Sequence, residues 1–273
     1  MSIGERIAFA RRKANIKQET LAAELDVSFQ AVSGWERDIS IPDTLHLIKL
    51  ADALQVSADW LLGRVDNAAP ARESLFDEGH MYPYLKAKLQ EAKLVQALYA
   101  LELAREKHAG QLRKGVHRKP YIIHPLTMAC HAWAMGVRDD DVISALLLHD
   151  VVEDTNTDID ELRVNERTRE AVRLVSYNTY ERMGSREQIK PEYYANIALN
   201  PLACIVKCID RCNNLSCMYD GFTNQKKAEY VRSTEEYIVP LLEVIKRRSE
   251  WNSIAWLLKY QITALLEAYK ALL

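Results

Sequence analysis

The sequence predicts an all-α protein made of two helical domains. Apolar residues recur at spacings of three and four along most of the 273 residues, and no alternating pattern long enough for a strand appears. Residues 66–83 lack this periodicity and contain Pro70, Gly79 and Pro83, which predicts a linker. The chain is long enough for two cores. We therefore expect a small bundle over residues 1–65 and a larger helical domain over residues 84–273.

The composition indicates an ordinary globular protein. Hydrophobic residues make up 48% of the chain and charged residues 27%, with a net charge of −2. This balance favours neither a nucleic-acid nor a membrane partner. No apolar run approaches the length of a membrane span, and the N-terminus lacks the basic-then-apolar layout of a signal peptide. We expect a cytoplasmic protein.

The five cysteines include three that recur every four residues, Cys204, Cys208 and Cys212, and would form one stripe on a helix. No two cysteines form a CxxC pair. We expect reduced thiols used as small core residues. A thiolate metal site is the less favoured alternative.

Helical periodicity predicts five short helices in the first domain, with Ser28 as the N-cap of the third. They cover residues 2–14, 18–25, 29–37, 44–54 and 57–62. In the second domain it predicts one long helix over 85–111 and a basic loop over 113–120. Further helices are expected at 124–135, 139–152, 167–176, from Pro201 past Asp210, at 223–247 and at 251–273.

The last of these helices carries an apolar seam with alternating spacings of four and three. The seam could pack on the domain's own core or join two chains, and we slightly favour a homodimer. Its members are Trp251, Ala255, Leu258, Ile262, Leu265, Tyr269 and Leu272.

The first domain carries a specific motif over roughly residues 3–63. It reads Gln18-x-x-Leu21-Ala22-x-x-Leu25-x-Val27-Ser28-x-x-x-Val32-Ser33-x-Trp35-Glu36-Arg37. The pattern resembles the helix-turn-helix of the lambda-repressor-like (Cro/repressor, XRE) family. The resemblance implies that the third helix enters the DNA major groove.

Matched by position, Phe29, Gln30, Ser33 and Gly34 would face base edges, and Gln18 and Arg37 would face phosphates. Gly34 lacks the longer side chain that is usual at its position and so removes one possible contact. Gln30 is the best candidate for reading a base, because a glutamine can pair with adenine through two hydrogen bonds.

The charge of this domain leaves an alternative open. Residues 1–64 hold 8 Lys and Arg against 9 Asp and Glu, a net of −1. DNA-binding domains usually present a basic face. Here only Arg11, Arg12, Lys13 and Lys17 cluster. We favour DNA binding, with a helix-turn-helix kept for dimerisation or protein contact as the alternative.

The second domain places two imidazoles and two carboxylates beside apolar helical segments. His149 and Asp150 follow Leu146-Leu147-Leu148, His124 lies upstream, and Asp210 lies downstream. Burying such groups is expensive unless a metal or a partner charge compensates. Two nitrogen and two oxygen ligands suit Mn, Fe, Co or Zn and leave positions open for water and substrate.

Two further acids lie close to this set. Glu153 is one helical turn past His149, and Asp154 is one turn past Asp150. They are placed to handle a proton or to orient water. The basic loop before His124 could hold a polyphosphate.

The His, His-Asp, Asp order is that of the HD superfamily of metal-dependent phosphohydrolases. The fuller pattern resembles the hydrolase domain of RelA/SpoT homologues and the small alarmone hydrolases, over about residues 85–245. It comprises His108-x-Gly110-Gln111-x-Arg113-Lys114-Gly115, Pro120-Tyr121-Ile122-x-His124-Pro125, Leu148-His149-Asp150-Val151-Val152-Glu153-Asp154-Thr155 and Lys207-x-x-Asp210-Arg211-x-Asn213-Asn214.

This resemblance implies removal of the 3′-diphosphate from (p)ppGpp or a related alarmone, normally with Mn²⁺, although another divalent transition metal could serve. It assigns Glu153 and Asp154 to water activation. The other roles it implies are substrate binding by Arg113 (base), Lys114 (phosphate) and Asn214 (nucleoside), and metal binding by His124, His149, Asp150 and Asp210.

Two departures from the family pattern leave the base and the number of phosphates open. The loop from Arg113 to Pro120 is longer than the usual Arg-Lys-Ser-Gly-Glu-Pro version, and Asn213 stands where the pattern usually has a histidine. The substrate could therefore also be a pppApp-type alarmone or another nucleotide. We expect no synthetase domain, because the remaining sequence is too short for one.

Two functions are consistent with these motifs. The first is an active alarmone hydrolase fused to a DNA-binding domain, serving as antitoxin to an alarmone synthetase and repressing its own operon. The second is a transcriptional regulator whose HD domain senses a nucleotide with little or no turnover. The intact Glu153 and Asp154 favour the enzyme, because a pure sensor need not keep water-activating acids.

Overall fold

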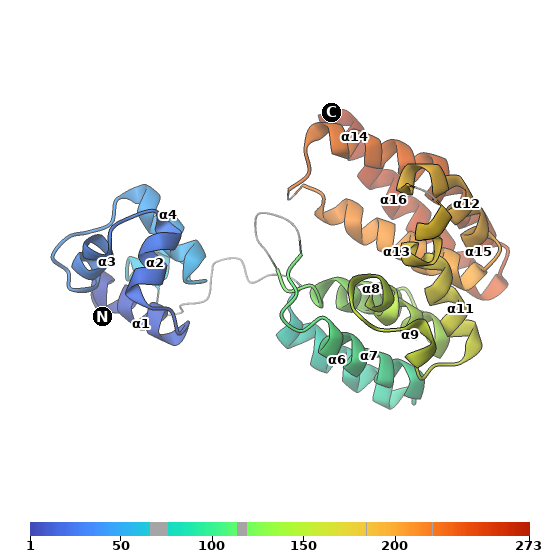
Figure 1. The fold of residues 1–273 in the computed structure, drawn as a ribbon, viewed down its shortest axis with the longest axis horizontal. Helices are drawn as coiled ribbons and strands as arrows, with labels where there is room; N and C mark the ends of the chain where they lie inside the picture. The colour runs from blue at the N-terminus through green and yellow to red at the C-terminus, as the bar shows by residue number, and fades with distance from the viewer. Residues whose placement is uncertain (66–75, 114–118, 184, 220) are drawn as a thin grey trace. The chain divides into compact units, whose positions relative to one another are not determined.

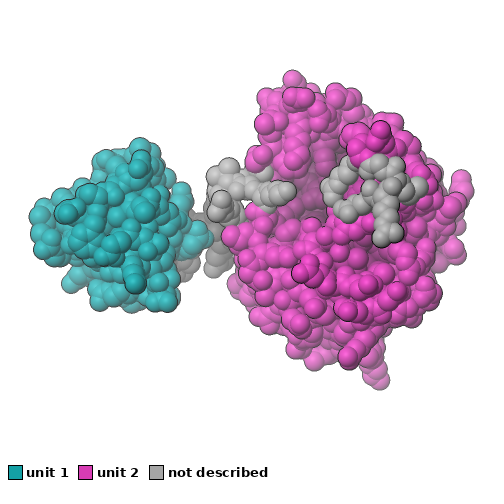
Figure 2. All heavy atoms as spheres, in the orientation of Figure 1, with its two compact units in different colours: residues 1–75 teal, residues 76–273 magenta. Residues whose placement is uncertain are grey.

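The computed structural model describes residues 1–65, 76–113, 119–183, 185–219 and 221–273. The chain forms two compact units, Met1–Leu75 and Phe76–Leu273, which are coloured separately in Figure 2. The described residues confirm the all-α prediction: they contain helices and one isolated bridge between Leu112 and Pro120, and no strand. None of their helices is long and apolar enough to cross a membrane.

The first unit contains the five predicted helices, each within one residue of the expected bounds. They are α1 (Ile3–Lys13), α2 (Gln18–Leu25), α3 (Phe29–Glu36), α4 (Thr44–Ala53) and α5 (Ala58–Leu61). Side-chain oxygens of Ser2, Ser28, Asp43 and Ser57 each accept a hydrogen bond from a backbone N–H in the first turn of the helix that follows. These caps explain why the boundaries could be predicted so closely.

A glycine allows α1 to approach the C-terminal end of α3. A Cβ atom added at Gly4 would lie 2.3 Å from the Trp35 carbonyl oxygen and 2.8 Å from Asp38 Oδ1. The Gly4 N–H also donates to Asp38 Oδ1 at 2.9 Å. Only a residue without a side chain fits here.

Gly4→Ala should therefore lower the free energy of unfolding of the first unit by about 1–3 kcal/mol, the usual cost of overpacking. Hydrogen exchange resolved by peptide would measure this separately for each unit. Gly34→Ala is the matched control, because its Cβ would meet only the end of the Ser40 side chain, at 3.0 Å. Equal losses in the two variants would show that the close approach at Gly4 is not the cause.

The second unit is built around α13 (Pro201–Cys217), which packs against α8, α9, α11, α12, α15 and α16 (Figure 1). The other helices are α6 (Glu78–Glu91), α7 (Val95–Lys107), α8 (Ile123–Ala134), α9 (Asp140–Leu148), α10 (Val151–Asp154), α11 (Glu166–Val175), α12 (Arg186–Ala198), α14 (Asn224–Ser233), α15 (Val239–Lys246) and α16 (Asn252–Leu272). Short 3₁₀ segments cover Ile159–Glu161, Tyr177–Met183 and Ser249–Trp251, and a π-helical turn covers Thr234–Ile238.

The single long helix predicted over residues 85–111 is wrong. The chain reverses between α6 and α7, with Lys93 in the left-handed region at φ 57°. Apolar residues keep their helical spacing on both sides of this turn, so periodicity alone could not show it. In addition, α6 begins at Glu78, within the stretch predicted as a linker, because Asp77 caps it by accepting from the His80 N–H.

Other differences are smaller. The helix predicted over 139–152 ends at Leu148 and resumes as α10, and the helix predicted over 223–247 contains the π-helical turn. No helix was predicted over residues 186–198, where α12 begins at a capping box formed by Ser185 and Gln188.

The apolar seam of α16 packs on the core of its own unit. Trp251, Ala255, Leu258 and Ile262 are buried, and α16 contacts α13, α14 and α15. The buried half of the seam therefore follows the alternative that it packs on its own core, while Leu265 and Tyr269 are half-buried and Leu272 is exposed, so the homodimer stays a prediction.

The cysteines behave as predicted. All five are free, and Cys204, Cys208 and Cys212 are buried on α13. Burial raises the pKa of Cys204 to about 12 and that of Cys212 to about 11, which keeps these thiols protonated and inert.

Candidate active site

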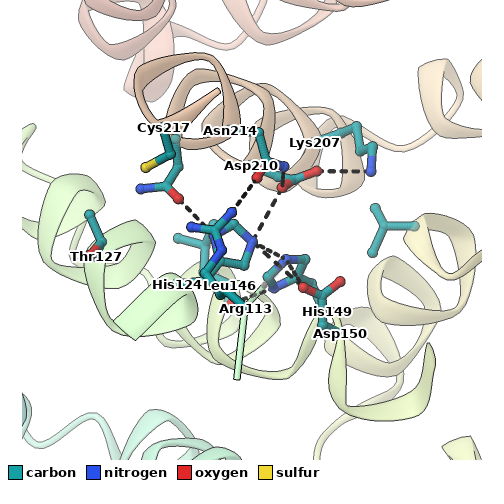
Figure 3. Close-up of polar contacts among 12 residues, drawn as sticks. Arg113, His124, Thr127, Leu146, His149, Asp150, Lys207, Asp210, Asn214 and Cys217 are labelled. Carbon is teal, nitrogen blue, oxygen red and sulfur yellow. Dashed lines mark hydrogen bonds and ion pairs between the residues drawn. The ribbon is translucent and has the colours of Figure 1, made fainter. Parts of the chain in front are cut away.

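Three segments far apart in the sequence bring the predicted metal ligands together (Figure 3). His124 lies in the first turn of α8, His149 and Asp150 occupy the junction between α9 and α10, and Asp210 lies in the middle of α13. Both histidines are 3% exposed and Asp210 is 6% exposed. The apolar faces of α8, α9 and α13 hold these groups in place because the rest of each helix is packed in the core.

The ligand atoms face one another at short range. His124 Nε2 lies 3.2 Å from His149 Nε2, 3.4 Å from Asp210 Oδ1 and 3.5 Å from Asp150 Oδ2. His149 Nε2 lies 3.0 Å from the same oxygen of Asp150. Among the described residues, His124, His149 and Asp210 form a group whose ligand atoms all lie within 4.8 Å of one another.

The other ring nitrogens of the two histidines decide what the facing atoms can do. His149 Nδ1 donates to the Leu146 carbonyl oxygen at 2.9 Å, and His124 Nδ1 donates to Asn213 Oδ1 at 2.7 Å. In the neutral rings both Nε2 atoms are therefore acceptors. Two imidazole lone pairs and two carboxylates repel one another unless a cation lies between them. The donor set thus fits a divalent metal, with outer partners already orienting the rings.

The electrostatics agree with a cation site. Burial disfavours a charged imidazole, but the adjoining carboxylates of Asp150 and Asp210 outweigh it and raise the pKa of His149 to about 8. Burial also disfavours the charged carboxylates, but the two imidazoles outweigh it at Asp150, and the Lys207 ammonium and the imidazoles outweigh it at Asp210, so both pKa values are lowered. Both acids are therefore ionised at neutral pH.

The two predicted water-handling acids lie on α10, beside the metal ligands in sequence. Glu153 is half-buried, and its Oε2 accepts a hydrogen bond from the Tyr177 N–H at 3.0 Å. Asp154 is exposed, and its backbone carbonyl accepts from Gln111 Nε2 at 3.0 Å. α10 is thus fixed at both acids by neighbouring segments.

Two of the three predicted substrate residues meet at the edge of the site. Arg113 Nη2 donates to Asn214 Oδ1 at 2.8 Å, and Asn214 Nδ2 donates to Asp210 Oδ1 at 2.5 Å. The predicted nucleoside contacts are thereby connected to Asp210, a predicted metal ligand. Lys114 lies outside the described residues.

Three further residues, quoted in the motifs without a role, support the ligands directly. The Tyr121 hydroxyl donates to Asp150 Oδ2 at 2.6 Å, and its ring stacks on His108 with centroids 4.8 Å apart. Lys207 pairs with Asp210 Oδ2 at 2.9 Å. The third is Asn213, which holds His124. In the sequence, only their short distance from the predicted ligands within each motif could have indicated this supporting role.

In the first unit, α3 presents Phe29 and Gln30 as exposed side chains, with Ser33 half-buried and Arg37 exposed at its C-terminal end. This places four of the five side chains predicted to contact DNA on or directly after one helix. Gly34, by contrast, is buried against Ser40.

Gln18 is engaged inside the first unit. Its Nε2 donates to Glu36 Oε2 at 2.6 Å, and Arg11 holds the same carboxylate through Nε at 2.5 Å and Nη2 at 2.9 Å. A phosphate contact from Gln18 would need its amide to be shared with Glu36. The charge of Arg11 is likewise neutralised by Glu36, so the basic cluster that the sequence indicated is weaker by one charge.

Comparison with known proteins assigns both parts of the chain. A helix-turn-helix family model (HTH_3) matches residues 7–61. Over 64 residues the chain is 42% identical to the HTH-type transcriptional regulator ImmR of Bacillus subtilis, covering 23% of this chain and 50% of that protein. The first unit is therefore a helix-turn-helix domain.

The second unit matches a different set of proteins. The chain is 33% identical over 177 residues to the guanosine-3′,5′-bis(diphosphate) 3′-pyrophosphohydrolase of Aquifex aeolicus, covering 63% of this chain but only 24% of that protein. It is 32% identical over 148 residues to the pyrophosphohydrolase MESH1 of Xenopus tropicalis, covering 52% of this chain and 82% of the relative. The human MESH1 gives 32% identity over 146 residues, covering 51% of this chain and 80% of the relative.

The solved structure of a metazoan orthologue of SpoT, described as hydrolysing ppGpp, aligns with a TM-score of 0.53 and 21% identity. The alignment covers 64% of this chain and 95% of that structure, and it supports the same helical fold. Together with the two-histidine, two-aspartate site on α8, α9 and α13, these relationships place the chain, beyond its N-terminal helix-turn-helix domain, in the family of the MESH1- and SpoT-like guanosine-3′,5′-bis(diphosphate) 3′-pyrophosphohydrolases.

Proposed function

We propose that the protein is a metal-dependent hydrolase that removes the 3′-diphosphate from (p)ppGpp or a related alarmone, and that its helix-turn-helix binds DNA. The observation that carries the proposal is the pair of Nε2 atoms 3.2 Å apart between two buried carboxylates, in a chain of this family. With both imidazoles neutral, as metal binding requires, every atom that faces the centre of the site is an acceptor, and this arrangement suits a divalent metal.

In this proposal His124, His149, Asp150 and Asp210 hold Mn²⁺ or another divalent transition metal. The bound ion would polarise a phosphoryl oxygen and lower the pKa of the attacking water. Asn213 and the Leu146 carbonyl keep both imidazoles oriented, and Tyr121 does the same for Asp150.

The chain's own residues then divide the remaining work. Glu153, held by the Tyr177 N–H, and Asp154 activate or orient the attacking water. Arg113 packs against the base and Asn214 contacts the nucleoside. To do so, the two side chains give up the hydrogen bond that now joins them. Lys114 neutralises phosphate.

The DNA-binding unit suggests a regulatory setting. A hydrolase that destroys an alarmone can act as antitoxin to an alarmone synthetase, and a DNA-binding domain on the same chain allows it to repress its own operon. The partner in this proposal is that synthetase, and the DNA partner is the operator.

The test of the hydrolase is release of pyrophosphate from a panel of 3′-diphosphorylated guanosine and adenosine nucleotides, with added Mn²⁺ and with a chelator as control. We expect metal-dependent release from at least one member. Protein that binds Mn²⁺ and nucleotide but releases nothing from the whole panel would replace the hydrolase with a nucleotide-sensing regulator.

DNA recognition should depend on Gln30 for sequence and on Arg37 for general affinity. Gln30→Ala should cost about 1–3 kcal/mol at one base position and relax the preference there. Arg37→Ala should weaken binding to all sequences and flatten the dependence of affinity on salt, because one phosphate contact is lost. Selection from genomic DNA, followed by titration of the enriched site, measures both. If the purified protein enriches no site at low salt, the unit serves protein contact instead.

A further inference from the structure

The two oxygens of Asp210 have different partners. Oδ2 pairs with Lys207 Nζ at 2.9 Å. Oδ1 faces His124 Nε2 at 3.4 Å and also accepts from Asn214 Nδ2. In Figure 3 dashed lines join the Asp210 carboxylate to Lys207 on one side and to His124 on the other. Oδ1 is therefore the oxygen directed toward His124, and Oδ2 is held by Lys207.

Lys207 occupies a closed site of its own, one helical turn before Asp210 on α13. Its side chain is 12% exposed, and Nζ lies 5.6 Å from the ring centroid of Tyr193 and 6.0 Å from that of Tyr177. Tyr193 is fully buried, stacks on Tyr177 with centroids 4.1 Å apart, and donates its hydroxyl to the Val175 carbonyl at 2.6 Å. The aromatic pair stabilises the ammonium group and fixes its position.

This arrangement makes it costly for Asp210 to turn. If Oδ2 moved toward the histidines, the ammonium of Lys207 would remain buried without its counter-ion, which is among the most destabilising changes a protein interior can undergo. The carboxylate is therefore restricted to offering one oxygen to a metal, although a carboxylate without such a partner can offer two.

We propose that Lys207 is a positioning residue that limits Asp210 to a single coordinating oxygen and so keeps one metal position open for water or the substrate phosphate. The inference rests on the proposed metal site. In a six-coordinate ion, four ligands that each give one atom leave about two open positions, whereas a chelating Asp210 would leave about one. Lys207 thus keeps one coordination position of the metal free for the reaction and does not increase the affinity for the metal.

The variant that tests this is Lys207→Met, whose unbranched side chain is only one atom shorter and carries no charge. Asp210 is then free to bind with both oxygens, and the nearby positive charge is gone. We expect Mn²⁺ affinity to stay the same or to increase, the number of exchangeable waters on bound Mn²⁺ to fall by about one, and turnover to fall by roughly 10–100-fold, the range seen when outer partners of a metal site are lost.

Water-proton relaxation of the Mn²⁺-loaded full chain counts these waters without relying on activity. Lys207→Arg is the matched control, because it keeps a cation beside Oδ2 and should retain the wild-type water count. If the Met variant does not reach wild-type helicity, Lys207→Gln removes the charge with a polar side chain and is expected to give the same loss of water.

Two results would overturn the inference. One is a charge-removing variant that binds Mn²⁺ with the wild-type water count, and the other is a variant that loses Mn²⁺ affinity, which would make Lys207 a support for binding only. Wild-type protein that binds no Mn²⁺ at all would instead overturn the proposed function, and the inference with it, so the two failures are distinguishable.

Discussion

Asp210→Ala protein should lose Mn²⁺ binding and pyrophosphate release together. Asp210 supplies the only ligand that α13 contributes, and its Oδ1 lies 3.4 Å from His124 Nε2. Removal also leaves Lys207 as a buried cation without its counter-ion, since the pair is 2.9 Å apart. The loss of affinity should exceed the 10–100-fold typical of outer partners, because a ligand itself is removed. His124→Ala should behave in the same way.

Calorimetric titration with Mn²⁺ and the pyrophosphate assay measure the two losses. Asp160→Ala is a suitable control, because its side chain is 82% exposed and the residue lies outside the site. A variant of Asp210 that still binds Mn²⁺ with wild-type affinity, while remaining folded, would remove Asp210 from the ligand set.

Glu153→Gln and Asp154→Asn should separate the two effects that Asp210→Ala combines: metal and nucleotide binding should be kept, and turnover should be lost. Neither residue is needed as a ligand, since four others converge without them. A positioned carboxylate contributes about 10²–10⁴-fold through proton transfer or water orientation. Glu153→Gln keeps an oxygen that can accept from the Tyr177 N–H, so the local structure of α10 should survive.

Single-turnover release of pyrophosphate, with nucleotide binding measured separately, distinguishes these effects. Glu161→Gln, on an exposed 3₁₀ turn, controls for the loss of a negative charge nearby. If both amide variants turn over like the wild-type protein, the proton is taken elsewhere. If they lose metal as well, the two acids belong to the ligand set.

Much of the site could be predicted because its residue types are rare together. A buried histidine followed by three acids within six positions is expensive without compensation, so His149, Asp150, His124 and Asp210 could be grouped before their geometry was known. The cap Ser28 likewise marked the start of a helix locally. These signals lie within a few residues of the feature they predict.

What could not be predicted depends on where distant segments meet. Lys93 reverses the chain inside an uninterrupted apolar pattern, so one long helix was expected in place of two. The contacts from Tyr121 to Asp150 and from Gln18 to Glu36 cross 29 and 18 residues of sequence. Side-chain partners at such separations become visible only in the folded chain.

The support for His124 has a consequence for the behaviour of the site in acid. Its Nδ1–H donates to the side-chain oxygen of Asn213, at the position where the related pattern usually carries a histidine. An imidazole can gain a proton between pH 5 and 8 and then can no longer accept a hydrogen bond. A neutral amide has no such transition. The orientation of His124 is therefore tied to a group that is indifferent to mild acidification.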